Sequence, residues 1–401
     1  MNPLSRPSFR GLLAGQVVSI AGDRFNYLAL VSLLTAHAAR AGHGPEGALA
    51  LLAWAMLAPA LVLSPWAGAV VDRLPLVRVL VWTDLARALV VAAIPLAYAA
   101  TGSSAGVYAL IALAFALNCF FLPARSALPP HLVDAPSLAW ANALLVLGGV
   151  LATLVGTALG GPLVDRFGPA PALWLDALTY LVSVLCLATL LFQGVDGRVP
   201  RAPHEVRHPL REARAGWALL SRSAEARAPV IASVMTWVAG GVLHVAGTAH
   251  VLGGSAKVSG LGFLIAALAV GAALGSWWTL ARPRPAHGLA LALARGLFGA
   301  GIGLACFASA RGGVAMALAA FLTGIFAAPV FFLSETAIQE AVPEGARARV
   351  FSARDFLARA AFLLTTAVTA PAVARFGTSV PIAATGAGMA VLGAITLFRR
   401  R

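Results

Sequence analysis

Charged residues are scarce in this sequence. Only 11% of its 401 residues are Asp, Glu, Lys or Arg, whereas 60% are hydrophobic. A water-facing surface needs more charge than this, so the composition excludes a set of soluble domains. The alternation of apolar and polar residues that membrane-barrel strands require is also missing. We therefore expect α-helices in lipid, because a helix satisfies its own backbone hydrogen bonds.

Cysteine is almost absent, and nucleotide-binding motifs are missing. Cys119, Cys186 and Cys306 lie in three different apolar segments without CxxC spacing, so we expect small core residues. No GxxxxGK[ST] segment occurs, which gives no support to ATP-driven chemistry. The glycine-rich run 299–303 lies within an apolar span, where glycine permits close helix approach. The sequence predicts no cofactor.

The charges that are present are mostly basic, and the net charge is +14. No soluble face combines basic residues with exposed aromatic residues, so nucleic acid is not an expected partner. Most Lys and Arg residues fall in alternate loops, which by the positive-inside rule predicts an inner (cytoplasmic) membrane protein with both termini cytoplasmic. The opposite loops hold Arg40, Arg166, Lys257, Arg311 and Arg375.

Long apolar runs separated by Gly, Pro and charged clusters predict twelve transmembrane helices. A run of about 20 apolar residues spans a hydrocarbon core about 30 Å thick. The fold class is therefore an all-α membrane protein with two six-helix bundles. The expected spans lie at 10–36, 47–71, 76–100, 105–128, 137–164 and 170–193, then at 228–252, 259–281, 287–309, 313–340, 346–374 and 378–398.

A long connector, 194–227, divides the chain into the predicted bundles 1–193 and 228–401. Apolar residues within 210–220 recur at helical spacing among arginines, which favours an amphipathic helix on the cytoplasmic leaflet; a partner-binding helix is the alternative. The halves also repeat, since the fifth and eleventh spans both run into Arg-Phe-Gly. Such a repeat is typical of two bundles that enclose a substrate cavity near the bilayer midplane.

The first span carries a polar stripe about 100° wide, formed by Gln16, Ser19, Asp23, Asn26 and Tyr27. Polar groups in lipid are costly, so the stripe must face protein or a water-filled cavity. Asp23 lies near mid-span, and we predict that it carries protons or cations. Gln16, Asn26 and Tyr27 are predicted to contact substrate. The alternative is a structural pairing of Asp23, for example with the arginine that follows it.

Other spans offer fewer polar groups. His244 lies at mid-depth in the seventh span and Thr248 follows one turn later. Histidine titrates near neutrality, so His244 is predicted as a second proton-coupling group, with a hydrogen-bonded packing role as the alternative. Asn118 and Thr248 are predicted substrate contacts. Glu335, near the cytoplasmic end of the tenth span, is predicted to couple cations, or else to be solvated or paired.

The connector contains one match to the zinc-protease pattern HExxH, at His204, Glu205 and His208. That chemistry needs both histidines on one helical face beside a third ligand. Pro209 disfavours helical geometry at the preceding residue, and no third ligand is evident in the loop. The sequence therefore predicts no metal site.

The turn after the second span reads Gly68-Ala-Val-Val-Asp72-Arg73-Leu-Pro-Leu-Val-Arg78 and resembles the cytoplasmic GxxxDRxGRR signature of the major facilitator superfamily. Pro75 replaces the second glycine of that signature. The chain is similar over essentially its whole length to the branch of macrolide-efflux and enterobactin-exporter proteins. Further matching segments are Gly15-Gln16, Gly22-Asp23, Trp82 to Ala88 and Pro343 to Ser352.

The resemblance implies that Gly68, Asp72, Arg73 and Arg78 form a conformational latch between helices. Asp84 and Arg87, at i and i+3 on the third span, are expected to extend that latch.

The resemblance also implies a monomeric secondary transporter that is not an enzyme. We expect a proton-coupled exporter of small amphipathic organic molecules that works by alternating access, with the lipid bilayer, protons or cations and a small molecule as partners. The alternatives are a lysophospholipid or lipid flippase on the same fold, a membrane zinc protease and a non-transporting sensor.

Overall fold

The computed structural model describes residues 2–195, 197, 224–255, 257–281, 288–342 and 344–398. The described part of the chain is helical and contains no strand. It includes 12 helices or helical segments that are long and apolar enough to cross a membrane. The predicted all-α membrane fold is therefore confirmed. The predicted connector helix and the HExxH match lie outside the described residues.

The chain divides into two compact units, which are described separately. The first comprises Met1–Ala41 and Trp54–Val206, and the second comprises Gly42–Ala53 and Arg207–Arg401. The division after Val206 falls within the predicted connector, and the short segment Gly42–Ala53 groups with the second unit.

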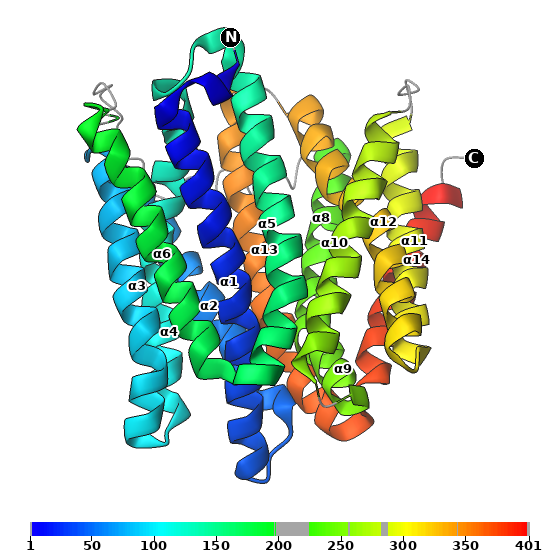
Figure 1. Cartoon of the computed structure of the whole chain (residues 1–401). Helices are drawn as coiled ribbons and strands as arrows, with labels where there is room; N and C mark the ends of the chain where they lie inside the picture. Colours follow the sequence, from blue (N-terminus) through cyan, green and yellow to red (C-terminus); the bar gives the residue numbers. More distant parts are fainter. Residues whose placement is uncertain are drawn as a thin grey trace. The chain divides into compact units, whose positions relative to one another are not determined.

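In the first unit, α1 packs on α5 and α6, and α3 packs on α4 and α6 (Figure 1). Short 3-10 turns, η1 (Pro3–Ser5), η2 (Pro129–His131) and η3 (Ala135–Ser137), flank these helices. The helices are α1 (Pro7–Arg40), α2 (Pro45–Val71), α3 (Leu76–Thr101), α4 (Ser104–Ala127), α5 (Leu138–Phe167) and α6 (Pro169–Phe192), with the start of α2 belonging to the second unit.

In the second unit, α11 packs on α14 and α12, α10 packs on α12, and α8 packs on α13 and α12. The predicted seventh span is interrupted, because a π-helical turn, η4 (Leu243–Gly247), separates α8 from α9. The helices are α8 (Ala224–Val242), α9 (Thr248–Ser255), α10 (Val258–Leu280), α11 (Gly288–Ser309), α12 (Gly313–Ala341), α13 (Glu344–Phe376) and α14 (Ser379–Phe398).

The outer faces of these helices are apolar. Leu185 is 69% exposed and Phe192 is 91% exposed, which in water would be strongly unfavourable and in lipid is not. Cys306 is also exposed, so the prediction that all three cysteines are core residues is wrong for this one. Its helix, α11, presents that position to the surroundings and buries Phe307 instead.

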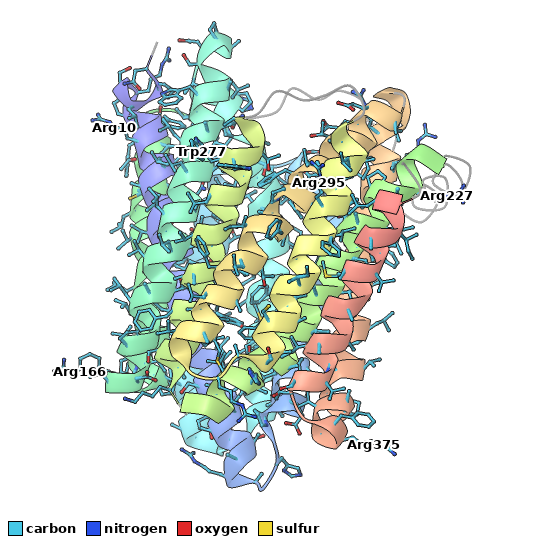
Figure 2. All side chains as sticks on the ribbon, turned by 90° about the vertical axis from the view of Figure 1, so that its right-hand side faces the viewer. Arg10, Arg166, Arg227, Trp277, Arg295 and Arg375 are labelled. Atoms are coloured by element: carbon cyan, nitrogen blue, oxygen red, sulfur yellow. The ribbon has the colours of Figure 1, made fainter. Side chains whose placement is uncertain are left out.

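Charged side chains mark the ends of each unit (Figure 2). Arg10 and Arg166 lie at opposite ends of the first unit, and Arg227 and Arg375 lie at opposite ends of the second. This distribution keeps these guanidinium groups out of the apolar layer that the helices cross.

The predicted Arg-Phe-Gly repeat has the same local structure in both units. α5 ends at Phe167 and α13 ends at Phe376, and the following glycines have φ angles of 84° and 78°. A positive φ strains residues with a side chain, so glycine is required at both turns. In each turn the arginine lies over the phenylalanine ring at 5.4 Å from its centroid.

Glycines bring several helices into backbone contact. A Cβ at Gly271 on α10 would clash with the carbonyl oxygen of Phe321 on α12, and one at Gly324 on α12 would clash with that of Leu268 on α10. The glycine run on α11 behaves in the same way, since a Cβ at Gly301 would meet the backbone of α14. The prediction that these glycines permit close helix approach is confirmed.

We expect Gly271→Ala to destabilise the second unit by about 1–3 kcal/mol, because the added methyl group forces α10 away from α12. Unfolding of the purified chain in detergent micelles, followed by circular dichroism, measures the change. Gly253→Ala is the matched control, since nothing lies within 4 Å of a Cβ at that helical position. Equal stability of the two variants would contradict the prediction.

Candidate functional site

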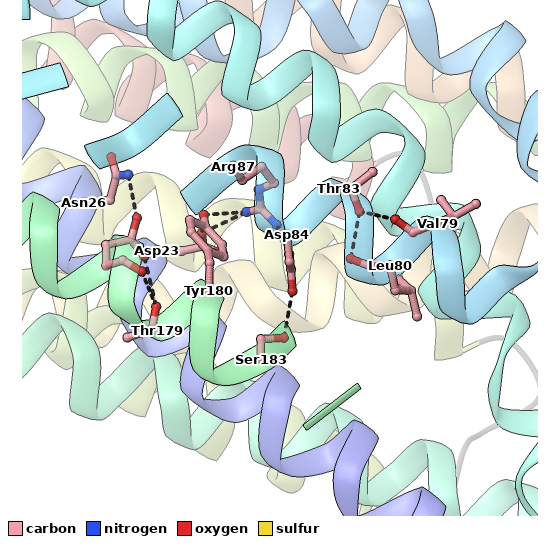
Figure 3. A network of polar contacts seen from close by, with 11 residues as sticks. Asp23, Asn26, Val79, Leu80, Thr83, Asp84, Arg87, Thr179, Tyr180 and Ser183 are labelled. Carbon is pink, nitrogen blue, oxygen red and sulfur yellow. Dashed lines mark hydrogen bonds and ion pairs between the residues drawn. The ribbon is translucent and has the colours of Figure 1, made fainter. Parts of the chain in front are cut away.

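Arg87 on α3 is the centre of a buried polar network in the first unit (Figure 3). Its Nη1 donates to Asp84 Oδ1 at 3.1 Å, and its Nη2 donates to Asp23 Oδ1 on α1 at 3.1 Å. The Arg87 side chain is only 6% exposed. One guanidinium therefore joins two carboxylates from two helices, and each hydrogen bond is charge-assisted.

Tyr180 on α6 supplies a further partner for the Arg87 guanidinium. Arg87 Nη2 donates to the Tyr180 hydroxyl at 2.6 Å, and that hydroxyl donates in turn to Asp23 Oδ1. The guanidinium carbon also lies 4.2 Å from the centroid of the Tyr180 ring, a cation–π geometry. Tyr180 thus fixes the position of both members of the Asp23–Arg87 pair.

Asp84 is held on its other side by α6. Ser183 donates its hydroxyl to Asp84 Oδ2 at 2.7 Å, and the Asp84 side chain is fully buried. Asp84 is therefore the inner end of the network, with no exposed side-chain surface. Asp23 is the outer end, with 31% of its side chain exposed.

A third carboxyl group lies beside the network. Asn26 Nδ2 donates to Asp176 Oδ2 at 2.6 Å, and the Thr179 hydroxyl lies 3.2 Å from Asp176 Oδ1. Asp176 is fully buried and has no ion pair with any described residue. Its carboxyl group fits only because Gly22 lacks a side chain, since a Cβ there would clash with both Asp176 and Thr179.

The network opens on a cavity of about 160 Å³ within the first unit. Asp23 is the only carboxylate among the described lining residues, and apolar groups such as Met56 and Phe115 form much of the remaining wall. Its polar lining residues are Asp23, Arg24, Asn26, Tyr27, Arg87, Asn118 and Tyr180.

In the structure, only part of the polar stripe predicted on the first span lines the cavity. Asp23, Asn26 and Tyr27 line the cavity, as does Asn118 from α4. Gln16 does not line it: this residue is 5% exposed, and its Nε2 donates to the Leu145 carbonyl on α5 at 3.1 Å. The close packing of α1 on α5 covers that end of the stripe.

The predicted groups of the second unit lie elsewhere. His244 Nε2 is 2.9 Å from the Leu49 carbonyl oxygen, and its ring lies 6.0 Å from that of Phe362. Thr248 is 2% exposed. Glu335 accepts from Arg354 of α13 at 3.2 Å, which is the paired alternative that the sequence left open.

The residues of the predicted latch lie in two places, an exposed turn between α2 and α3 and the buried network around Arg87. Asp72 and Arg73 are exposed beyond the end of α2, as is Arg78 near the start of α3. Gly68 lies in α2, and nothing lies within 4 Å of the point where a Cβ would stand. Asp84 and Arg87, expected to extend this latch, are instead buried with Asp23, because α3 turns that face toward α1 and α6.

Sequence reasoning missed the contribution of α6. Asp176, Tyr180 and Ser183 follow one another at spacings of four and three, so they form a polar stripe on one helical face. That stripe was visible in the sequence of the sixth span and indicates the same kind of buried polar face as the stripe of the first span.

The twelve apolar spans define a multi-pass membrane protein with a buried polar network in its first unit. The family model of the Major Facilitator Superfamily matches residues 12–365. This chain belongs to the Major Facilitator Superfamily, which places it among transporters and not enzymes.

Individual relatives match about half of the chain. The multidrug efflux pump Tap of Mycolicibacterium fortuitum is 30% identical over 198 residues, which cover 48% of this chain and 46% of Tap. A Bacillus subtilis protein named as a candidate bacilysin exporter, BacE, is 28% identical over 195 residues, covering 47% of this chain and 46% of that protein. The chain thus spans about half the length of the curated relatives that it matches.

Solved structures share the fold over nearly the whole chain. The nucleoside transporter NupG superposes with a TM-score of 0.77 at 11% identity, covering 97% of this chain and 99% of NupG. A bacterial homologue of the iron transporter ferroportin, in its inward-facing state, gives 0.68 at 17% identity, with 97% and 98% covered. At these identities the likeness shows the fold alone.

We expect Arg87→Gln to lower the free energy of unfolding by about 3–5 kcal/mol, because removal of the guanidinium leaves the buried Asp84 carboxylate and the partly exposed Asp23 carboxylate without their cation. Adding Asp84→Asn to this variant should recover part of the loss. Unfolding in mixed detergent micelles measures both effects.

Arg166→Gln is the control, since that arginine is exposed at the end of α5. Its effect should stay within about 0.5 kcal/mol. A stability of Arg87→Gln equal to that of Arg166→Gln would show that the network does not hold α1, α3 and α6 together.

Proposed function

We propose that this chain is a proton-coupled secondary active exporter that moves small amphipathic organic molecules by alternating access. The observation that carries the proposal is the position of Asp23. Its carboxylate is part of the cavity wall and is also one of the two anions that hold Arg87. A single group thereby links the cavity to an ion pair between helices.

Protonation of Asp23 would act through that ion pair. A neutral carboxyl group attracts Arg87 far less than a carboxylate does, so the link from α1 to α3 weakens while Asp84 keeps the guanidinium in place on α3. A change in the charge of one group is the kind of local event that biases a two-state conformational element. The proton would leave Asp23 once the cavity opens to the other side of the membrane.

The cavity lining supports a substrate with both polar and apolar parts. Asn118 and Tyr27 supply hydrogen-bonding groups, and the wall near Met56 and Phe115 supplies apolar surface. Such a mixture is typical of sites for organic molecules. Asn26 is already bonded to Asp176, so we assign it a supporting role.

Outward transport is the direction suggested by relatives, because one is named as a multidrug efflux pump and another as a candidate exporter. The excess of basic residues in alternate loops supports an inner-membrane location with both termini in the cytoplasm. We further propose that the exposed turn from Asp72 to Arg78 acts as the latch between states.

Asp23→Asn should abolish proton-coupled transport. In proteoliposomes with an internal pH dye, wild-type protein should move protons when ethidium or fluorescein is added as an amphipathic organic probe, whereas the variant should show at most a few per cent of that flux. The reason is that an amide cannot release a proton.

Asp165→Asn, an exposed carboxyl group near the end of α5, is the control and should retain wild-type flux. Full proton-coupled flux in Asp23→Asn would overturn the assignment of Asp23. Transport of labelled lysophospholipid, without transport of ethidium or fluorescein, would favour a lipid flippase.

A further inference from the structure

Arg24 lies near the middle of α1, and no described residue forms a hydrogen bond or ion pair with it. Its Nε atom is buried and unpaired. The neighbouring Asp23 directs Oδ1 toward Arg87 and Tyr180 instead. The pairing of Asp23 with Arg24 that the sequence left open is therefore not formed.

The base of the Arg24 side chain lies at a close contact between α1 and α5. A Cβ at Gly156 on α5 would lie 2.9 Å from the Arg24 Cβ, so the two helices meet closely at this point. The Arg24 side chain forms part of the wall of the cavity in the first unit.

The charges around the cavity do not balance. Two guanidinium groups, those of Arg24 and Arg87, and one carboxylate, that of Asp23, belong to its wall. Arg87 shares its charge between Asp23 and the buried Asp84, so the charge of Arg24 has no direct counterion among the described residues. An unpaired cation deep in a membrane span is unfavourable, and such residues typically serve a ligand.

The remaining wall indicates what kind of anion fits. The cavity of about 160 Å³ is close in size to one of about 150 Å³ that accommodates benzene. Ile111, Phe115 and Met56 contribute apolar surface. A guanidinium is a planar fork of donors that matches a carboxylate in two parallel hydrogen bonds, and one uncompensated positive charge matches a monoanion better than a dianion.

We infer that Arg24 binds the carboxylate of an amphipathic organic anion whose apolar body lies against Phe115 and Met56. This carboxylate-binding site deepens the proposed export function, on which the transport of such an anion depends. Binding itself does not depend on transport, so the two can be tested apart.

The test measures binding of benzoate to the purified full chain in detergent by thermal unfolding, with benzamide as the neutral analogue of the same shape. A ligand that binds only the folded state raises the Tm with its concentration. Benzoate should raise the Tm of the wild-type chain, and benzamide should not. Arg24→Gln should weaken benzoate binding about tenfold or more, and Arg24→Lys less, because lysine keeps the charge without the fork.

Arg295→Gln is the matched control: it removes the same charge from an exposed position on α11, outside this cavity (Figure 2). It should bind benzoate as the wild type does. The ligand-free melting curve of each variant establishes that it folds, and if Arg24→Gln does not fold, Arg24→Lys supplies the comparison. Unchanged benzoate binding in the folded Arg24 variants would overturn the inference.

Equal stabilisation by benzamide, or stronger stabilisation by phenylphosphonate, would overturn the carboxylate assignment, and so would failure of benzoate to stabilise the wild-type chain. Benzoate binding that needs Arg24, in a chain that moves no proton with any probe, would remove the proposed export function and leave the site. Proton-coupled transport in a chain whose benzoate binding is unchanged by Arg24→Gln would remove the site and leave the proposed export function.

Discussion

The first unit depends on one shared cation. Arg87 is almost completely buried, and in an apolar surrounding a guanidinium is stable only beside anions and hydrogen-bond acceptors. Asp23 on α1, Asp84 on α3 and Tyr180 on α6 supply these groups, so three helices that are distant in sequence must meet at one point. The same requirement makes Asp23 both a partner of Arg87 and a part of the cavity wall. The proposed coupling follows from that double role.

Glycine makes the required helix approach geometrically possible. Lipid tails are as apolar as the helix surfaces, so helices in a membrane associate largely through close packing and polar contacts. Gly22 leaves room for Asp176 and Thr179 against α1, and Gly156 brings α5 against the stem of Arg24. Polar groups of the site are therefore positioned by residues that have no side chain.

Part of the site was predictable because a charge inside an apolar run is visible without any structure. Asp23 was identified in this way, and Asn26 and Tyr27 by their helical spacing from it. Asp84 and Arg87 lie in a segment that resembles the family and were predicted to extend the latch, because the sequence does not show which helix α3 faces. Gln16 shares the stripe of Asp23, yet it bonds to the backbone of α5.

Residence in the membrane, the helical fold and the positions of the spans follow from the sequence alone, because hydropathy and backbone hydrogen bonding act locally along the chain. Which charges are paired becomes clear only when the helices are packed. Asp23 bonds to a residue 64 positions away while Arg24 beside it has no described partner, a difference set by which helices meet and at what rotation. Pairing between distant helices depends on packing, which no local pattern encodes.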